Sequence, residues 1–424
     1  MGTTPSDDFP VTASERADAA ACGPRAAPVA DPLFEWLARS VLRGAGRPPV
    51  RFVLPGGREV AASRKDPVAR LHVRDRRALA RLLLDPELCF GDDYTAGRIE
   101  VQGDLVRFVE EAFRALEKAG PISMAASRVR GWLLPARRNS RGGSKENIHH
   151  HYDLGNEFYR LWLDDRMVYT CAYFPSPDAD LEEAQVAKMN HVCRKLRLRP
   201  GESVAEAGCG WGALALHMAR EHGVSVRAFN VSREQVAWAR ERARREGLAG
   251  RVEFVEDDYR NLTGRYDAFV SVGMLEHVGR EHYRDLGRVI HRCLTPTGRG
   301  LLHSIGRNRP GRLHRWLERR IFPGAYPPTL REVLSVIEPH GFSVLDVENL
   351  RLHYARTLEH WLARFERSAT KVRQMFDEAF VRAWRLYLAG SVAAFRTGSL
   401  QLFQVTFARP QDNGIPWTRD HLYR

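Results

Sequence analysis

Short apolar segments alternate with segments of helical periodicity along most of the C-terminal part of the chain. From Asn147 onward, apolar runs are separated by stretches in which apolar residues recur every three or four positions, such as Gly212–His222 and Arg233–Glu246. The strands predicted from the apolar runs are Ser203–Ala207, Ser225–Val231, Val252–Glu256, Tyr266–Val272, Gly300–Ile305, Phe342–Val347 and Leu400–Phe407. This alternation is typical of an α/β fold with a doubly wound, mostly parallel sheet. Because such folds bind ligands at the carboxyl ends of their strands, the residues that follow each strand are site candidates.

A different pattern precedes it in residues 31–125. Amphipathic helices are predicted for Pro32–Leu42, Arg77–Leu84 and Leu105–Lys118. The strands predicted in this region are Val50–Leu54, Glu59–Ala62 and Ala69–Val73, with Pro55-Gly56-Gly57 as a hairpin turn between the first two. We therefore expect a small N-terminal, lipid-associated α+β domain over residues 31–125 and a larger catalytic α/β domain over residues 147–424.

Two segments lie outside these domains. Residues 1–30 are rich in Ala, Pro, Ser, Thr and Asp and are expected to form a disordered tail. Residues 126–146 are expected to form a basic linker, in which Arg and Lys residues alternate with Pro and Gly. Its cations either contact lipid headgroups or are simply solvated, and the sequence leaves both interpretations open.

Motif content limits the environment of the chain. The N-terminus lacks the apolar stretch of a signal peptide, and no apolar run is long enough to span a bilayer. The six cysteines form no CxxC pair, so neither a zinc site nor a disulfide framework is indicated. Adjacent His149, His150 and His151 do not share one face of a helix or strand, and no metal site is expected there. These features favour a cytoplasmic protein.

The formal net charge of the chain is +13. Such a charge attracts a polyanionic partner, either nucleic acid or an anionic lipid surface. An Arg-rich composition without any such partner explains the charge equally well. Charge alone does not separate these alternatives.

The strongest local signal is Val204–Gly212, where an apolar strand runs into a glycine-rich turn and then a helix. Gly208, Gly210 and Gly212 are cofactor-binding candidates, because a backbone without Cβ atoms can approach a ligand closely. The N-terminus of the following helix adds free N–H groups and a partial positive charge. A turn of this kind is weak evidence by itself, since many tight strand-to-helix turns resemble it.

Polar residues at the ends of neighbouring strands narrow the choice of ligand. Asn230 and Gln235 follow the second strand, where ribose is usually bound. Asp258 and Tyr259 follow the third strand, where they can hold an adenine, and Glu206 can pair with a methionine ammonium group. A dinucleotide site usually has GxGxxG and an acidic residue at the end of the second strand, and neither feature is present. The pattern predicts S-adenosylmethionine (AdoMet) and a class I methyltransferase fold, which is a Rossmann-like sheet of seven strands.

Four further segments converge on one family. They are His150–Asn156, Tyr169–Phe174, Val272–Gly279 and Leu302–Gly306. Together with the Gly-Cys-Gly-Trp-Gly turn, they closely resemble the cyclopropane-fatty-acyl-phospholipid synthases and the related mycolic acid methyltransferases, over about Asn147–Arg409. Phe90–Tyr94 and Val101–Leu105 resemble the phospholipid-type members, whereas the mycolic acid enzymes generally lack that N-terminal domain.

The resemblance implies a reaction in which the cis double bond of an unsaturated phospholipid acyl chain attacks the sulfonium methyl group of AdoMet. A carbocation then forms on the acyl chain, a base removes a proton from the new methyl group, and a cyclopropane ring closes. The site has to be dry, because water would quench the cation. In this family the base is a bound bicarbonate.

The resemblance also implies which side chains take part. The bicarbonate would be held by Cys171, Glu276, His303, the backbone N–H of Ile305 and Tyr354. A small anion needs directed donors, which imidazole, phenol and backbone N–H groups supply, and a protonated Glu can donate as well. By the same resemblance, Tyr169 and Thr170 contact AdoMet.

These assignments have structural alternatives that the sequence leaves open. Cys171 is alternatively a small buried apolar residue, His303 a core histidine bonded to the backbone, and Tyr354 a packing residue. Glu276 is harder to explain in this way, because a carboxylate at a strand end beside Met274 is costly to bury unless it is used.

Two positions depart from the family's pattern. Glu206-Ala207 stands where Asp-Ile is more usual, but Glu keeps the charge, so we expect cofactor binding to be retained. Ser391 aligns with a stretch in which many relatives carry a cysteine. We expect that cysteine to be dispensable, because nothing in the mechanism requires a thiol.

Apolar helical segments favour a lipid substrate. Arg312–Ile321, Leu358–Phe365 and Val372–Phe395 carry Trp, Phe, Leu and Met at helical spacing, and Phe322–Pro328 is expected to be a rigid turn. They either wall an acyl tunnel or form ordinary helix core. Peripheral contact with an anionic membrane surface is expected, and a homodimer is left open.

The leading hypothesis is therefore a cyclopropane-fatty-acyl-phospholipid synthase. A close variant uses the same cation to make a methyl- or methylene-branched chain. A nucleic-acid methyltransferase is disfavoured, because neither an Asn/Asp-Pro-Pro-Tyr motif nor a Pro-Cys nucleophile is present, and no nucleic-acid partner is expected. The set Glu276, His303 and Tyr354 argues against a catalytically dead lipid-binding protein.

Overall fold

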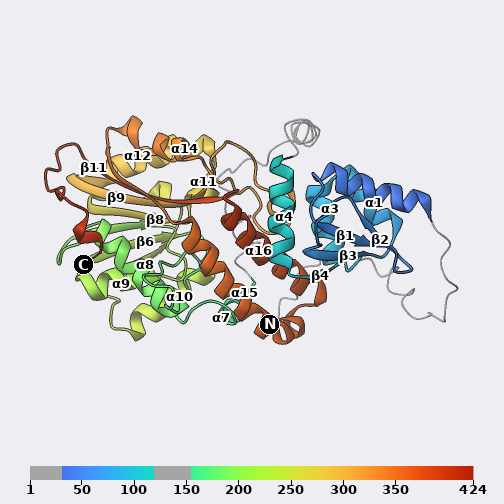
Figure 1. Cartoon of the computed structure of the whole chain (residues 1–424). Helices are drawn as coiled ribbons and strands as arrows, with labels where there is room; N and C mark the ends of the chain where they lie inside the picture. Colours follow the sequence, from blue (N-terminus) through green and yellow to red (C-terminus); the bar gives the residue numbers. More distant parts are fainter. Residues whose placement is uncertain (1–30, 119–153, 424) are drawn as a thin grey trace.

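The computed structural model describes residues 31–118 and 154–423, which form a smaller and a larger unit around separate sheets (Figure 1). The predicted tail at 1–30, the basic linker at 126–146 and the histidines at 149–151 lie outside the described residues. The larger unit contains a seven-stranded sheet and the smaller unit a four-stranded sheet.

The seven-stranded sheet has the order β10-β11-β9-β8-β5-β6-β7. Its strands are β5 (Ser203–Ala207), β6 (Ser225–Asn230), β7 (Val252–Glu256), β8 (Tyr266–Val272), β9 (Leu294–Gly306), β10 (Ser343–Asn349) and β11 (Gln401–Ala408). Neighbours from β7 to β9 are parallel, whereas β11 runs antiparallel to β9 and β10. The predicted doubly wound, mostly parallel sheet is confirmed. The prediction missed the start of β9, because Thr295–Arg299 is polar and contains Pro and Gly.

Helices cover both faces of this sheet (Figure 1). They are α8 (Leu181–Lys195), α9 (Ala213–His222), α10 (Arg233–Arg245), α11 (Leu275–Val278), α12 (Tyr283–Cys293) and α14 (Leu330–Ile337), with 3-10 turns at Tyr259–Asn261, Arg280–His282 and Glu338–His340. The start of α8 is a capping box: Asp180 accepts from the Glu183 N–H at 2.8 Å, and the Glu183 carboxylate accepts from the Asp180 N–H at 3.2 Å. This cap fixes where α8 begins and therefore which of its residues face the sheet.

Further helices lie beside the sheet and bury most of the large aromatic residues. They are α7 (Asn156–Arg160), α13 (Arg315–Arg320), α15 (Arg351–Met375) and α16 (Glu378–Thr397). The sequence suggested one helix over Val372–Phe395, but α15 ends at Met375 and a new helix begins at Glu378. The Asp377 carboxylate caps this new helix by accepting from the Phe380 N–H at 2.7 Å. In the described ranges, no helix combines the length and apolarity needed to cross a membrane.

The smaller unit packs four helices against its own sheet. Its elements are α1 (Pro32–Gly44), β1 (Val50–Val53), β2 (Glu59–Ala61), β3 (Ala69–Val73), α2 (Arg76–Leu84), α3 (Pro86–Thr95), β4 (Ile99–Gly103) and α4 (Leu105–Lys118), with the sheet order β2-β1-β3-β4. The predicted hairpin between β1 and β2 is present. Helix α3 was not predicted from periodicity, because Gly and Asp residues interrupt its apolar positions. The buried Asp93 within it accepts from Arg98 Nε at 2.7 Å.

The two units are joined through helices of both. In Figure 1, α4 lies beside α16, and α3 also contacts α13 and α16. Arg320 of α13 donates to both carboxylate oxygens of Asp92, each at 3.1 Å. Arg382 of α16 donates to the Tyr94 carbonyl at 2.6 Å and lies over the Tyr94 ring at 4.4 Å. The smaller unit therefore holds the outer sides of α13 and α16.

Gly91 is where α3 approaches α13 most closely. A Cβ atom added to Gly91 would lie 2.3 Å from ring carbon Cδ1 of Trp316. We expect Gly91→Ala to displace this indole and to lower the free energy of unfolding by roughly 1–3 kcal/mol, as overpacking of buried contacts does. Urea denaturation followed by tryptophan fluorescence measures the change. Gly44→Ala is the control, because nothing lies within 4 Å of its added Cβ; equal stability of the two variants would contradict this contact.

Candidate active site

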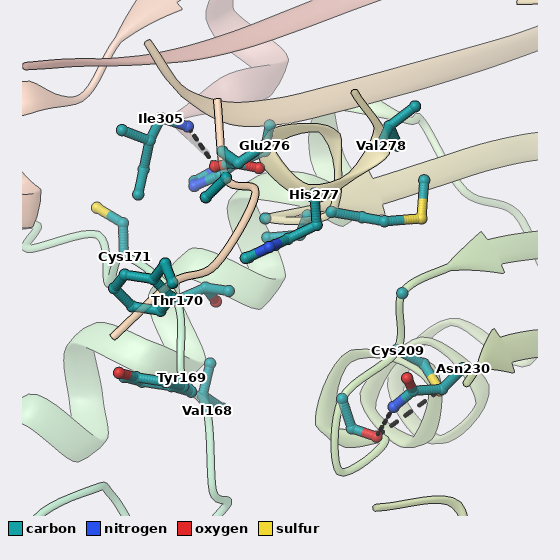
Figure 2. Close-up of a pocket in the computed structure, with 18 of the residues that line it drawn as sticks. Val168, Tyr169, Thr170, Cys171, Cys209, Asn230, Glu276, His277, Val278 and Ile305 are labelled. Atoms are coloured by element: carbon teal, nitrogen blue, oxygen red, sulfur yellow. Dashed lines mark hydrogen bonds between the residues drawn. The ribbon is translucent and has the colours of Figure 1, made fainter. Parts of the chain in front are cut away.

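A cavity of about 240 Å³ lies at the carboxyl ends of β5, β6, β8 and β9. Every site residue predicted from the sequence lines it, except Gly212. Apolar residues of the α13–α16 region complete the wall, among them Leu313, Leu317, Phe322, Leu358, Tyr387 and Phe395. Figure 2 shows Glu276, Ile305 and Cys171 toward one end of the cavity and Cys209 and Asn230 toward the other. We call these the reacting end and the nucleotide end.

The glycine-rich turn after β5 needs all three of its glycines, for different reasons. Gly208, Gly210 and Gly212 have φ values of 82°, 52° and 80°, in the left-handed region that other residues rarely adopt. A Cβ added to Gly208 would lie 2.8 Å from the Met274 side chain. A Cβ added to Gly210 would have no atom within 4 Å, because Gly210 lines the cavity. A Cβ on Gly212 would lie 2.5 Å from the Phe254 ring. Gly212, a predicted cofactor residue, therefore serves the packing of α9 instead of lining the cavity.

The end of β6 is tied to this turn. Asn230 donates from Nδ2 to the Gly210 carbonyl at 3.2 Å, as Figure 2 shows, and to Gln235 Oε1 at 2.7 Å. Gln235 Nε2 is buried and has no hydrogen-bond partner among the described residues. An unpaired buried donor in a polar cavity suits a ligand hydroxyl, such as those of a ribose.

The residues after β7 divide between a structural and a ligand-facing position. Asp258 Oδ1 accepts from the Arg260 N–H at 2.9 Å and caps the 3-10 turn that begins at Tyr259. The Tyr259 hydroxyl is buried without a partner in the described part of the chain, and burial raises the pKa of Tyr259 to about 12. Tyr259 is therefore neutral and lines the cavity, and Asp258 orients the turn that carries it.

Two buried ionisable groups, one on β5 and one on α8, also line the cavity. Glu206, at the end of β5, is 2% exposed, and burial raises its pKa to about 8. Its Oε2 atom has no partner among the described residues. Lys188 of α8 donates from Nζ to Thr170 Oγ1 at 3.0 Å, and burial lowers its pKa to about 8. The sequence analysis missed Lys188, because a lysine within an amphipathic helix is ordinarily solvated.

Glu276 and Ile305 form the central contact of the reacting end. The Ile305 N–H donates to Glu276 Oε1 at 2.6 Å, and the bond joins the chain after β8 to the end of β9 (Figure 2). Glu276 Oε2 is buried without a partner among the described residues. Burial raises the pKa of Glu276 to about 7, so both its acid and its carboxylate forms exist near neutral pH. The Ile305 N–H and the Glu276 carboxyl group, which were both predicted to hold the anion, are thus hydrogen-bonded to each other.

His303 has a partner that the sequence analysis did not identify. Gln404 stands opposite His303 in the register of β11 with β9, and its Nε2 lies 2.9 Å from His303 Nδ1. Burial lowers the pKa of His303 to about 3, so the ring is neutral. With Nδ1 accepting from the amide, the ring proton is on Nε2. Finding this pair from sequence requires the register of two strands far apart in the chain.

The remaining predicted residues occupy the same cavity wall. Cys171 is fully buried, its Sγ donates to the Ala172 carbonyl at 3.1 Å, and burial raises the pKa of the thiol. Tyr354 packs against Phe395, with 4.6 Å between ring centroids. The Tyr169 and Tyr387 hydroxyl oxygens lie 2.8 Å apart. Cys171 is therefore a protonated thiol. Tyr354 belongs to α15, and Tyr387 belongs to α16, so these two helices form part of the cavity wall.

Outside the cavity, one group of potential metal ligands is present in the described residues. The ligand atoms of Cys193, His217 and His222 lie within 4.8 Å of one another. His217 Nε2 also lies 2.7 Å from Asn190 Oδ1, and burial lowers the pKa of His217 to about 4. None of the three residues lines the cavity, so this group is separate from the candidate active site.

Comparison with known proteins gives the family context of this geometry. The sequence matches the mycolic acid cyclopropane synthetase family over residues 139–405. It is 36% identical over 370 residues to a probable fatty acid methyltransferase of Pseudomonas putida, covering 84% of this chain and 92% of that protein. It is also 36% identical over 355 residues to the cyclopropane-fatty-acyl-phospholipid synthase of Escherichia coli K12, covering 82% of this chain and 90% of that protein.

A solved structure resembles the larger unit. The mycolic acid cyclopropane synthase CmaA1 complexed with SAH and CTAB has a TM-score of 0.60 and 29% sequence identity, and it covers 62% of this chain and 98% of its own. The fold, the family resemblance and the AdoMet dependence that the sequence predicted are confirmed by these matches.

The raised pKa of Glu276 predicts how the free energy of unfolding depends on pH. An unfolded chain releases the Glu276 proton near pH 4.5, whereas the folded protein keeps it until about pH 7. Between these values the unfolded state binds fewer protons, so this residue lowers the free energy of unfolding as pH rises. Glu276→Gln removes the titration. We expect the stability of the variant relative to wild type to increase from about pH 4.5 to about pH 7 and then to level off.

Urea denaturation of both proteins without ligand, over a pH series, measures this difference. Other titrating groups are common to both proteins and cancel. A stability difference that does not change with pH would contradict the raised pKa.

Proposed function

The chain belongs to the mycolic acid cyclopropane synthetase family, and from that premise we propose that it converts the cis double bond of an unsaturated phospholipid acyl chain into a cyclopropane ring. AdoMet, when bound, supplies the methyl group that provides the ring carbon. The observation that carries the proposal is a single cavity that contains the glycine turn, the Glu276–Ile305 pair and an apolar wall. A small polar substrate has less need of such an apolar wall than an acyl chain has.

The nucleotide end has groups that fit AdoMet. Gln235 Nε2 and the Tyr259 hydroxyl are buried donors without partners among the described residues, and they are suited to the ribose and adenine. Glu206 Oε2 is a buried acceptor suited to the methionine ammonium group. In this proposal Gly208 and Gly210 allow the backbone to contact the cofactor, while Asn230 holds the turn in place.

The chain's own groups at the reacting end suit a carbocation. A cation on the acyl chain is lost if a strong nucleophile or water reaches it. Cys171 is a protonated thiol that donates to a backbone carbonyl, and the Nδ1 lone pair of His303 is occupied by Gln404. Neither side chain is a competent nucleophile in this state. The aromatic and aliphatic wall formed by Leu358, Tyr387 and Phe395 helps to exclude water.

A bound bicarbonate would supply the base in this proposal. The Ile305 N–H occupies Glu276 Oε1, so in the acid form of Glu276 the proton is available on Oε2, which faces no other partner in the described residues. His303 Nε2–H is a second donor, and Cys171 and Tyr354 complete the proposed cage. Ile305 then acts by orienting Glu276.

Substrate delivery is proposed for the smaller unit and the basic linker. The acyl chain would lie along the apolar wall of α13–α16, and α13 and α16 are also the helices that the smaller unit contacts. The domain over residues 31–125 and the cations of residues 126–146 would contact the anionic membrane surface from which the phospholipid comes. We propose this contact to be peripheral.

A branched product is the second candidate. The Pseudomonas putida relative is as similar to this chain as the Escherichia coli synthase, at 36% identity, and it is named a probable fatty acid methyltransferase. The same cation yields a methylene-branched chain when a 1,2-hydride shift along the acyl chain precedes loss of the methyl proton, and a saturated methyl branch requires in addition an external hydride donor such as a reduced nicotinamide. The product therefore depends on where the base stands relative to the cation.

Expression in a bacterial host that makes no cyclopropane lipids tests the proposal. Mass spectrometry of fatty acid methyl esters should show chains that are one CH₂ heavier than the host's monounsaturated chains and that contain no double bond. An added methylene with the double bond retained would favour the branched product. Unchanged lipids in a host that accumulates the protein, with methylation of RNA instead, would overturn both.

Glu276→Gln tests the proposed role of this carboxyl group. The amide retains the acceptor for the Ile305 N–H but has no acid form, so we expect lipid product to fall by roughly 100-fold or more while AdoMet binding stays nearly unchanged. Product analysis and isothermal titration calorimetry measure the two quantities. Glu253→Gln, at an exposed position of β7, is the control and should retain both. Loss of AdoMet binding in Glu276→Gln would assign this residue to the cofactor instead.

A further inference from the structure

Lys188 is a buried lysine that has no carboxylate within ion-pair distance among the described residues. It lies on α8, is 2% exposed and lines the cavity. Its Nζ donates to Thr170 Oγ1 at 3.0 Å. Lys195, on the same helix, is also buried, but it pairs with Glu348 at 2.6 Å. Within the described part of the chain, one buried lysine of α8 thus has a counter-ion and the other has none.

An ammonium group in this position has donors to spare. A lysine ammonium carries three N–H donors, and Thr170 accepts one of them. Taking an unpaired charge out of water costs several kcal/mol, so such groups ordinarily pair or lose their proton. Burial indeed lowers the pKa of Lys188 to about 8, which still leaves the charged form populated near neutral pH. An anion entering the cavity would satisfy both the charge and the free donors.

The neighbours of Lys188 narrow the identity of that anion. Glu206 and Asp164 contribute to its electrostatic environment, but Asp164 is already occupied by the N–H groups of Arg166 and Val168, at 3.0 and 2.9 Å. Thr170 is expected to contact AdoMet, and Glu206 is suited to the methionine ammonium group. Lys188 therefore stands beside the place proposed for the amino-acid end of the cofactor.

We propose that Lys188 binds a small carboxylate in the cavity, with the carboxylate of AdoMet as its first occupant. Lys188 and Glu206 together then recognise the zwitterionic amino acid, one through its carboxylate and the other through its ammonium group. Bicarbonate offers the same chemistry from a second source, since the hydrogen bond of Lys188 to Thr170 places it beside the chain segment that carries Cys171. The choice of the AdoMet carboxylate rests on the family matches, whereas the bicarbonate alternative rests on the proposed function.

Calorimetric titration of the full-length wild-type protein with AdoMet and with decarboxylated AdoMet tests it without any lipid. A charge-assisted hydrogen bond to the carboxylate should make AdoMet bind roughly 10- to 100-fold more tightly than the decarboxylated compound. In Lys188→Met this preference should disappear, while the affinity for decarboxylated AdoMet stays nearly the same. A general loss of structure would weaken both ligands together, so the ratio of the two affinities isolates the contact.

Two further variants serve as controls. Lys195→Met removes the other buried lysine of α8 and should leave the preference for AdoMet intact. Lys188→Arg keeps the charge and should restore part of the preference lost in Lys188→Met. If Lys188→Met does not fold, the comparison in the wild type still tests the cofactor carboxylate.

A bicarbonate arm distinguishes the second source. An unchanged preference for AdoMet in Lys188→Met, together with a raised sodium bicarbonate requirement for turnover, would support the carboxylate role with bicarbonate as the occupant. If neither the preference nor the bicarbonate requirement changes, Lys188 binds no carboxylate and the inference is overturned. Because AdoMet binding is measured without lipid, absence of a cyclopropane product would count against the proposed function and not against the contact of Lys188 with the AdoMet carboxylate.

Discussion

The hydrogen bond between the Ile305 N–H and Glu276 Oε1 is the contact on which the reacting end depends. It joins the segment after β8 to the end of β9, two neighbouring strands whose carboxyl ends form the same edge of the sheet. The bond occupies one carboxyl oxygen and leaves the other without a partner among the described residues. Because the group is buried, its pKa rises to about 7, and it can exchange a proton near neutral pH. One backbone donor thereby determines which oxygen is available to a ligand.

Burial controls the other ionisable groups of the cavity in the same way. The pKa of Glu206 is raised to about 8, that of Lys188 is lowered to about 8, and that of His303 is lowered to about 3. Each shift moves its group toward the neutral form, which is the expected response to a low-dielectric site. Near neutral pH the ammonium group of Lys188 is then the main fixed charge among these three groups, because Glu206 and His303 are mostly neutral.

The apolar wall couples this site to the rest of the molecule. Helices α13 and α16 border the cavity on one side and the smaller unit on the other. The contacts to the smaller unit are partly charged, as with Arg320 and Asp92, and partly tight packing, as with Gly91 and Trp316. A displacement of the smaller unit would therefore reach the proposed acyl site through two packed helices. The physical route is direct contact, with no need for a longer pathway.

The sequence by itself determined the strand–helix order, the glycine turn and the strand-end residues, because hydrophobic periodicity and the absence of Cβ atoms are local properties. It placed Glu206, Asn230, Glu276 and His303 correctly at strand ends that the sheet then brought to one cavity. Only the tertiary structure decided that Gln404 pairs with His303, since this follows from the register of β11 with β9. The same holds for Gly212, which faces Phe254 and not the cavity, and for Lys188, whose burial depends on how α8 packs. Partners and burial are set by segments far apart in the chain, and a local pattern carries no information about them.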